Sequence, residues 1–272
     1  MCECRAGSVG RALILLLACR AGAAQWVQYA APGVPRLANG APNVNAPAPR
    51  SSDGKPDLSG IWVDEENRPC PPYNCDDMLT PQEFWDIGWS LKGGLPYQAW
   101  AAALVKQRGE TRGMADPTSH CLPGGPVKLH TDPLYRKMVQ TGGLLLILNE
   151  RNTMYRQIFT DGRPLPEDPQ PAWNGYSTGH WEGDVLVVKT SGFRGELWLD
   201  RKGSPLTEAG TMVERFRRVN YGKLEIEMTV DDPKAYTAPW TVTLHQNLKP
   251  DTELMDYICL ENEKDLRHIG GK

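Results

Sequence analysis

The sequence predicts a mainly β protein, in which an antiparallel up-and-down β-barrel or strongly curved sheet follows an N-terminal two-helix extension; a β-sandwich is the alternative. Eight strand-like runs lie between residues 144 and 259, separated by turns rich in Gly, Asn, Asp and Pro. In the run KLEIEMTV, residues 223–230, apolar and polar residues alternate, so one face should be buried and the other hydrated. Closing such a sheet hides its edges, and eight strands enclose enough space for one small ligand.

The expected strands belong to an antiparallel β domain at residues 131–262. In chain order the runs are 144–150, 153–161, 175–182, 184–190, 213–220, 223–230, 240–247 and 253–259. A further short strand is expected near DGKPDLSGIW, where folded sequence begins and Leu58 and Trp62 lie on either side of a glycine.

Two helices are expected in the preceding segment, 56–130, which should pack on the barrel as a helical and loop extension. TPQEFWDIGWSL, residues 80–91, begins with a threonine and has a glutamate three residues later, a capping box that satisfies free N–H groups. In residues 93–109, Pro96 should open a helix and Gly109 should close it. The tryptophans of both helices carry much apolar area and are expected in the core: Trp85, Trp89 and Trp100.

The first 24 residues have the pattern of a secretory signal peptide: arginines, a short apolar run and small residues before a cleavage point near Ala24. The apolar run is too short for a permanent membrane-spanning helix. The tetrapeptide LLAC also resembles a lipoprotein box, so a lipid anchor at Cys19 is the alternative to soluble export. A Pro/Ala-rich flexible arm at 25–55 and a C-terminal tail at 263–272 are expected around the folded part. The predicted location is periplasmic or extracellular.

Charge and hydropathy exclude several kinds of partner. The formal net charge is −3, which provides no electrostatic footprint for nucleic acid or for an anionic membrane. No later apolar run approaches the roughly 20 residues of a transmembrane helix. We therefore expect neither a nucleic-acid partner nor a transmembrane segment, and the oligomeric state stays open.

Four cysteines lie beyond the signal peptide, and in an oxidising compartment an even count indicates two disulfides. The spacing CPPYNC favours a bond between Cys70 and Cys75, which leaves Cys121 to pair with Cys259. Four cysteines allow three connectivities, so the other two pairings stay open. Zinc is disfavoured because two pairs with short, regular spacing are absent.

The stretch ADPTSHCLPGGPVKLHTDP, residues 115–133, concentrates chemically active side chains between the helices and the first long strand. Cys121 is interpreted as a disulfide partner rather than a nucleophile beside His120, because an exported cysteine with an available partner is usually oxidised. The prolines and glycines indicate a stiff connector. His130 and Asp132 remain as acid–base candidates. No metal site is predicted, since no spacing of the histidines places two of them on one element.

Further candidates lie in the β domain. If His180 and Arg156 point inward, the histidine could move a proton while the arginine stabilises negative charge. The candidate catalytic residues are His180, His130, Asp132 and Asp161. The candidate ligand-binding residues are Arg156, Arg163, Trp173, Tyr176, Trp181 and Trp240, because arginine and aromatic side chains suit a small organic ligand. Solvated turn charges and core-filling tryptophans would explain the same residues structurally.

The leading functional hypothesis is an exported protein that binds a small organic ligand in the barrel interior. One alternative is a hydrolase, lyase or isomerase that uses a His/carboxylate pair at the barrel mouth. The other is a structural or envelope-associated interaction protein. No phosphate loop or dinucleotide fingerprint is found in the sequence, so no cofactor is expected.

Several runs together resemble a large family of secreted proteins of environmental bacteria that have no assigned activity. These runs are DLSGIW, LPYQAWAAALVKQR, CLPGGPV, YRQIFTDGRPLP, GHWEGDVLVV, ERFRR and DDPKAYTAPW. The resemblance covers nearly all of the chain beyond the signal peptide. It implies export and a β-rich, lipocalin-like domain, and it assigns no functional residue.

Overall fold

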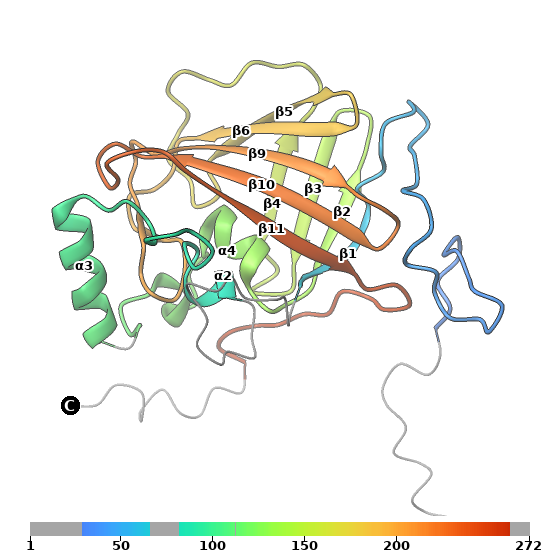
Figure 1. Ribbon diagram of the computed structural model, residues 1–272, viewed down its shortest axis with the longest axis horizontal. Coiled ribbons are helices and arrows are strands. Elements are labelled where there is room, and N and C mark those ends of the chain that lie inside the picture. The colour runs from blue at the N-terminus through green and yellow to red at the C-terminus, as the bar shows by residue number, and fades with distance from the viewer. Residues whose placement is uncertain (1–28, 66–81, 112, 262–272) are drawn as a thin grey trace, which may run out of the picture.

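The computed structural model describes residues 29–65, 82–111 and 113–261. Within these ranges nine strands form a closed barrel in the order β1-β11-β10-β9-β6-β5-β4-β3-β2 (Figure 1). The predicted β-barrel class is therefore confirmed. The signal peptide, Cys19, the pair Cys70 and Cys75, and the tail 263–272 lie outside the described residues.

The barrel strands and the smaller elements follow the chain in a simple order. The barrel consists of β1 (Gly60–Asp64), β2 (Arg136–Gln140), β3 (Leu144–Asn149), β4 (Tyr155–Phe159), β5 (Tyr176–Glu182), β6 (Val185–Ser191), β9 (Thr211–Arg218), β10 (Lys223–Asp231) and β11 (Trp240–Leu248). A separate two-stranded sheet consists of β7 (Leu197–Trp198) and β8 (Pro205–Leu206). The described helices are α2 (Gln82–Trp85), α3 (Ala99–Glu110), the 3-10 helix η1 (Pro117–His120) and α4 (Gly125–Thr131).

The first strand of the fold, β1, closes the barrel. β1 pairs with β11 on one side and with β2 on the other, so strands from both ends of the fold meet. The expected final strand, 253–259, is wrong. In place of a strand, this segment forms one isolated β-bridge, between Tyr257 and Arg151. The physical reason is that β1 already occupies the edge of β11 to which that segment would have paired.

The expectation of a purely antiparallel barrel is also wrong at one seam. β4 and β5 pair in parallel, through Ile158 with Ser177 and Phe159 with Thr178. Every other neighbouring pair in the barrel is antiparallel. A parallel pair needs a long crossover instead of a tight hairpin, and the proline-rich connection 160–175 supplies it.

The alternation predicted for residues 223–230 is confirmed. Leu224, Ile226, Met228 and Val230 are all buried, whereas the residues between them are exposed or partly exposed. The inward faces of β9 and β11 contribute Phe216 and further apolar side chains to the same core. Buried apolar side chains therefore occupy much of the barrel interior, where the sequence hypothesis placed a ligand.

The helices differ from their expected extents. α2 is a single turn, and residues 86–91 form turns rather than the rest of a helix. α3 starts at Ala99 rather than at Pro96, and Gly109 lies inside it. Trp89 is buried as expected, but Trp85 and Trp100 are 43% and 47% exposed, so their predicted core role is wrong. α3 turns only small residues such as Ala101 toward the core, and the Trp100 indole instead donates to the Lys234 carbonyl at 2.7 Å. Among the described helices, none is long and apolar enough to cross a membrane.

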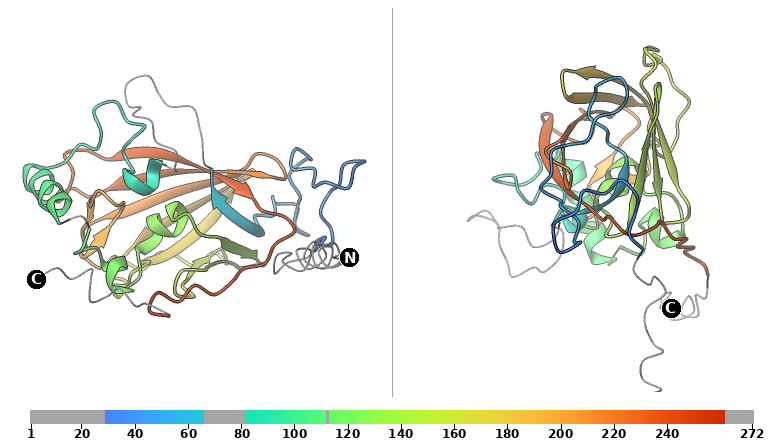
Figure 2. Two further views of the ribbon diagram at one scale, coloured as in Figure 1. Left: turned by 90° about the horizontal axis from the view of Figure 1, so that it is seen from below. Right: turned by 90° about the vertical axis from the view of Figure 1, so that its right-hand side faces the viewer.

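The two ends of the barrel are covered by different segments. The helices lie at one end, and the N-terminal arm lies at the other (Figures 1 and 2). The described part of the arm is held by two ion pairs, Arg36 with Asp251 and Arg50 with Asp184. The helical end is where buried polar side chains gather, and it therefore holds the candidate site.

Candidate functional site

A groove opens in the barrel wall where β4 and β5 diverge. Only two residue pairs join these strands, so the first half of β4 and the incoming segment 172–176 separate. The space between them has a volume of about 500 Å³. Gly175 allows this path: its φ is 61°, and a Cβ there would lie 2.7 Å from the Ser191 carbonyl oxygen. We call this space the wall groove; its lining residues are Pro123, Asn152–Gln157, Phe159 and Ala172–Ser177.

Arg156 and Ser177 form the polar floor of the wall groove. Both belong to the inward-facing residues of their strands, and both are 1% exposed. The Arg156 guanidinium donates to both carboxylate oxygens of Glu214, with Nη1 at 2.9 Å from Oε1. It also donates to the Ser177 hydroxyl and, at 3.0 Å, to the Thr190 hydroxyl. The charge of Arg156 is thus neutralised by a bidentate carboxylate partner from β9.

His130 extends this network inward from α4. Its Nε2 lies 3.1 Å from Glu214 Oε1, and the side chains of both residues are fully buried. Burial lowers the pKa of His130 by disfavouring the imidazolium, and the charges of Arg156 and Arg136 add to this effect against the opposing pull of Glu214. Because Glu214 accepts only, the neutral ring carries its proton on Nε2. Its Nδ1 then has no hydrogen-bond partner among the described residues.

Glu214 is ionised in this setting. Burial alone would raise its pKa, but the charge of Arg156 and the hydrogen bonds from His130 and Arg156 outweigh burial and lower the pKa to about 2. A neutral imidazole, a carboxylate and a guanidinium therefore form one buried unit with no net charge.

Backbone contacts hold α4 in the end of the barrel. The buried guanidinium of Arg136 donates to the carbonyls of Leu129 and His130, which caps the C-terminal turn of the helix. Gln246 adds a bond from Nε2 to the His130 carbonyl at 3.1 Å. Desolvation lowers the pKa of Arg136 to about 10, so it stays charged at neutral pH. These contacts fix the position of His130.

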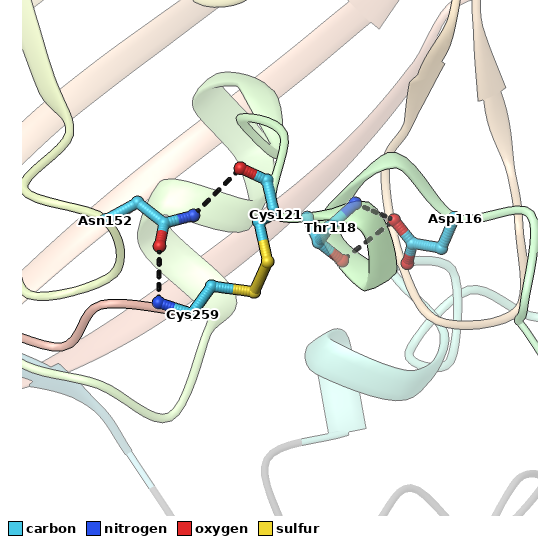
Figure 3. Close-up of a disulfide and its surroundings, with 5 residues drawn as sticks. All are labelled: Asp116, Thr118, Cys121, Asn152 and Cys259. Atoms are coloured by element: carbon cyan, nitrogen blue, oxygen red, sulfur yellow. Dashed lines mark hydrogen bonds between the residues drawn. A yellow bond between two sulfur atoms is a disulfide. The ribbon is translucent and has the colours of Figure 1, made fainter. Parts of the chain in front are cut away.

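A disulfide fixes the rim of the wall groove. Cys121 and Cys259 are bonded, which confirms that pairing (Figure 3). Asn152 joins both cysteines: its Nδ2 donates to the Cys121 carbonyl at 3.1 Å, and the Cys259 N–H donates to its Oδ1 at 2.9 Å (Figure 3). Asn152 and Thr153 have φ angles of 52° and 50°, a left-handed turn that these contacts hold in place.

Aromatic rings form the sides of the wall groove, and arginines outside its lining contact two of them. Arg194 lies 4.8 Å from the Trp173 ring centroid, and Arg163 lies 4.0 Å from that of Phe159. The ring centroids of Phe159 and Tyr176 are 5.3 Å apart, and the two ring planes are tilted by 30°. Cation–π contacts of this kind restrict the rings and present them as platforms.

The structure gathers some of the predicted site residues and separates others. Arg156, Trp173 and Tyr176 line the wall groove, and Arg163 lies at its edge, paired with exposed Asp161. Beneath the groove lies His130. Asp132 bonds Arg151 at 2.6 Å rather than His130, and burial raises its pKa.

The remaining predicted residues lie elsewhere. His180 is on the outer surface, where its Nε2 is 3.2 Å from Glu182. Trp181 lines a separate space of about 60 Å³ with Asp53 and Gln140. Trp240 packs in the core against Tyr236. Among the described residues no group of three His, Cys, Asp or Glu side chains could hold a metal.

Sequence reasoning missed Glu214, the central residue of the network. The run ERFRR, residues 214–218, is mostly charged, but the alternation of the strand carries the signal: Met212, Glu214 and Phe216 share one face of β9, and all are buried. A carboxylate on the buried face of a strand needs a buried cationic partner, and the inward-facing Arg156 of β4 supplies it, although β4 and β9 are not neighbours in the barrel.

Fold and site together define a disulfide-bonded closed β-barrel with a lateral, aromatic-lined groove. Comparison with models of known protein families finds no match, and comparison with curated protein sequences also finds none.

Proposed function

We propose that this protein binds a small organic molecule in the wall groove. The observation that carries the proposal is a groove of about 500 Å³ with aromatic sides and a polar, fully paired floor. Ligand sites in proteins combine this range of volume with apolar walls and a few fixed polar groups. The site lies in the wall rather than in the interior, because core side chains already occupy the interior.

Burial of His130 favours binding over acid–base catalysis. Of the predicted acid–base residues, His130 is the one that lies beneath the groove, and its side chain is fully buried. His130 and Glu214 are within hydrogen-bond reach of each other, but neither side chain has exposed surface. Arg156 and Ser177 separate the pair from the groove. Their role in this proposal is to keep the floor rigid and uncharged.

Native mass spectrometry of the protein purified from its own host tests the proposal. We expect a retained small molecule whose occupancy falls when Tyr176→Ala removes one side of the wall groove. His180→Ala, on the exposed outer face of the same strand, should leave occupancy unchanged. Equal loss in both variants, or equal retention, would contradict binding in this groove.

We also propose that the protein is exported, on the basis of its N-terminal sequence pattern and the Cys121–Cys259 disulfide. Cell fractionation followed by intact-mass measurement tests this. The expected product starts near Ala24 or carries a lipid at Cys19, and an uncleaved cytoplasmic chain would contradict export.

A further inference from the structure

The wall groove has a chemistry that selects among ligand classes. Its one charged lining residue is Arg156, whose Nε, Nη1 and Nη2 all donate to partners inside the protein. A ligand carboxylate or phosphate would therefore lose hydration in the groove, and Arg156 would not be available to pair with its charge. The floor thus disfavours an anion and suits an uncharged molecule.

Aromatic rings line the sides of the groove, and neighbouring side chains hold them in position. Trp173 and Phe159 each have a guanidinium on the ring, and each of these arginines is in turn paired with a carboxylate two residues away, Glu196 or Asp161. Because the rings are already restrained, the protein loses little further side-chain entropy when a ligand stacks on them. A molecule with a flat or slightly puckered apolar face matches these platforms.

The same groove offers neutral hydrogen-bonding groups between the rings. Gln157 is exposed on the outward face of β4 and lines the groove. Asn174 donates its Nδ2 to the Tyr155 carbonyl at 2.9 Å, which fixes the amide and leaves Oδ1 as an acceptor. The Tyr155 side chain is 59% exposed, so the groove is open to solvent along this edge. Amide groups beside aromatic faces match a ring that carries hydroxyls around its edge.

From this combination we infer that the wall groove binds a neutral carbohydrate, with a sugar ring stacked on Trp173 and its hydroxyls bonded by Gln157 and Asn174. The inference rests on the proposed function and specifies its ligand class. An apolar C–H face and a hydroxylated edge are the two features of a pyranose that this groove complements, and an open edge lets further sugar units extend into solvent.

Titration of the full mature protein, with its disulfide intact, tests the inference. The probes are cellotriose, maltotriose and chitotriose, followed by tryptophan fluorescence and by calorimetry. At least one should bind, and Gln157→Ala should weaken its binding about tenfold, because the variant loses a direct hydrogen bond to a ligand hydroxyl. Trp173→Ala should weaken it more, and circular dichroism confirms the fold of each variant. Trp100→Ala is the matched control, since Trp100 is exposed on α3 away from the groove.

A parallel titration with 2-naphthol, a flat aromatic without the sugar's ring of hydroxyls, separates the two proposals. Trp173-dependent binding of 2-naphthol without binding of any trisaccharide would overturn the carbohydrate class and leave the groove as a ligand site. Absence of Trp173-dependent binding by every probe would overturn the carbohydrate inference, while a host-derived ligand lost from Tyr176→Ala would still support the groove. Saccharide binding that survives both Trp173→Ala and Gln157→Ala would also overturn the inference.

Discussion

At the residue scale, the stability of the barrel end depends on a buried ion pair with a neutral neighbour. Arg156 and Glu214 are both at most 1% exposed, so each charge depends on the other for compensation. Thr190 and Ser177 satisfy the remaining donors of the guanidinium. Such pairs contribute little compared with an apolar replacement, but removal of one partner is costly.

Glu214→Gln should lower the free energy of unfolding by about 3–5 kcal/mol, because it leaves the Arg156 charge buried without a counter-charge. Urea unfolding measures the change. Glu227→Gln is the control: Glu227 lies on the exposed face of β10 and is 4.0 Å from Arg215. Its effect should stay within about 0.5 kcal/mol, and similar losses for the two variants would contradict the role assigned to the buried pair.

His130 should make the protein less stable in weak acid. Its native pKa lies below the ordinary value of 6.5 because of burial and of Arg156 and Arg136, with Glu214 opposing. The unfolded chain therefore takes up a proton first as pH falls below 6.5, which favours unfolding. Glu214, with a pKa of about 2 against an ordinary 4.5, adds a second loss at lower pH, since its ionised form stabilises the fold.

Unfolding measured between pH 7 and pH 4.5 checks this expectation. His130→Gln should flatten the slope of stability against pH in that range, whereas His180→Gln should keep the slope, because His180 is exposed. An unchanged slope in His130→Gln would show that other groups cause the acid sensitivity.

At the element scale, one disulfide and the Asn152 side chain tie together three segments that the barrel strands do not join. The residues Cys121 and Cys259 are separated by 138 positions, and Asn152 bridges their backbones. The cysteine count predicted two disulfides, and the CPPYNC spacing favoured this pair by assigning Cys70 to Cys75. The helix α4 was not predicted: Pro126 and two glycines indicate a connector, and the helix forms because Arg136 caps it from inside the barrel.

Replacing both cysteines, Cys121→Ser with Cys259→Ser, should lower the free energy of unfolding by about 4–5 kcal/mol, the loop-closure entropy expected for a loop of this length. Urea unfolding of the double variant and of the oxidised parent gives the difference. Asn152→Ala should cost less and should leave the disulfide intact by mass. A double variant as stable as the parent would mean that the rim is held by other contacts.

At the scale of the whole molecule, the barrel has one weak seam. Eight of its junctions are antiparallel, whereas β4 and β5 share two residue pairs in parallel. Amide exchange should reflect this difference: β10, paired along its length on both sides, should exchange only through global unfolding, and β4 should open locally and exchange faster. Hydrogen exchange followed by mass spectrometry measures both segments, and equal protection of β4 and β10 would contradict a weak seam.

Local signals in the sequence determined seven strands of the β domain, because alternation and turn residues act within a few positions of the chain; they did not indicate β2, and they wrongly indicated a strand at 253–259. They also marked Arg156, Trp173 and Tyr176 as ligand-binding candidates, although they placed His180 and Trp240 beside them. Only the tertiary structure decided which strand edges met. β1 reached β11 and displaced the expected strand at 253–259, and the crossover at 160–175 brought β5 beside β4 in parallel. The wall groove and the pairing of Arg156 with Glu214 follow from those long-range choices, since residues 58 positions apart approach each other only when the barrel closes.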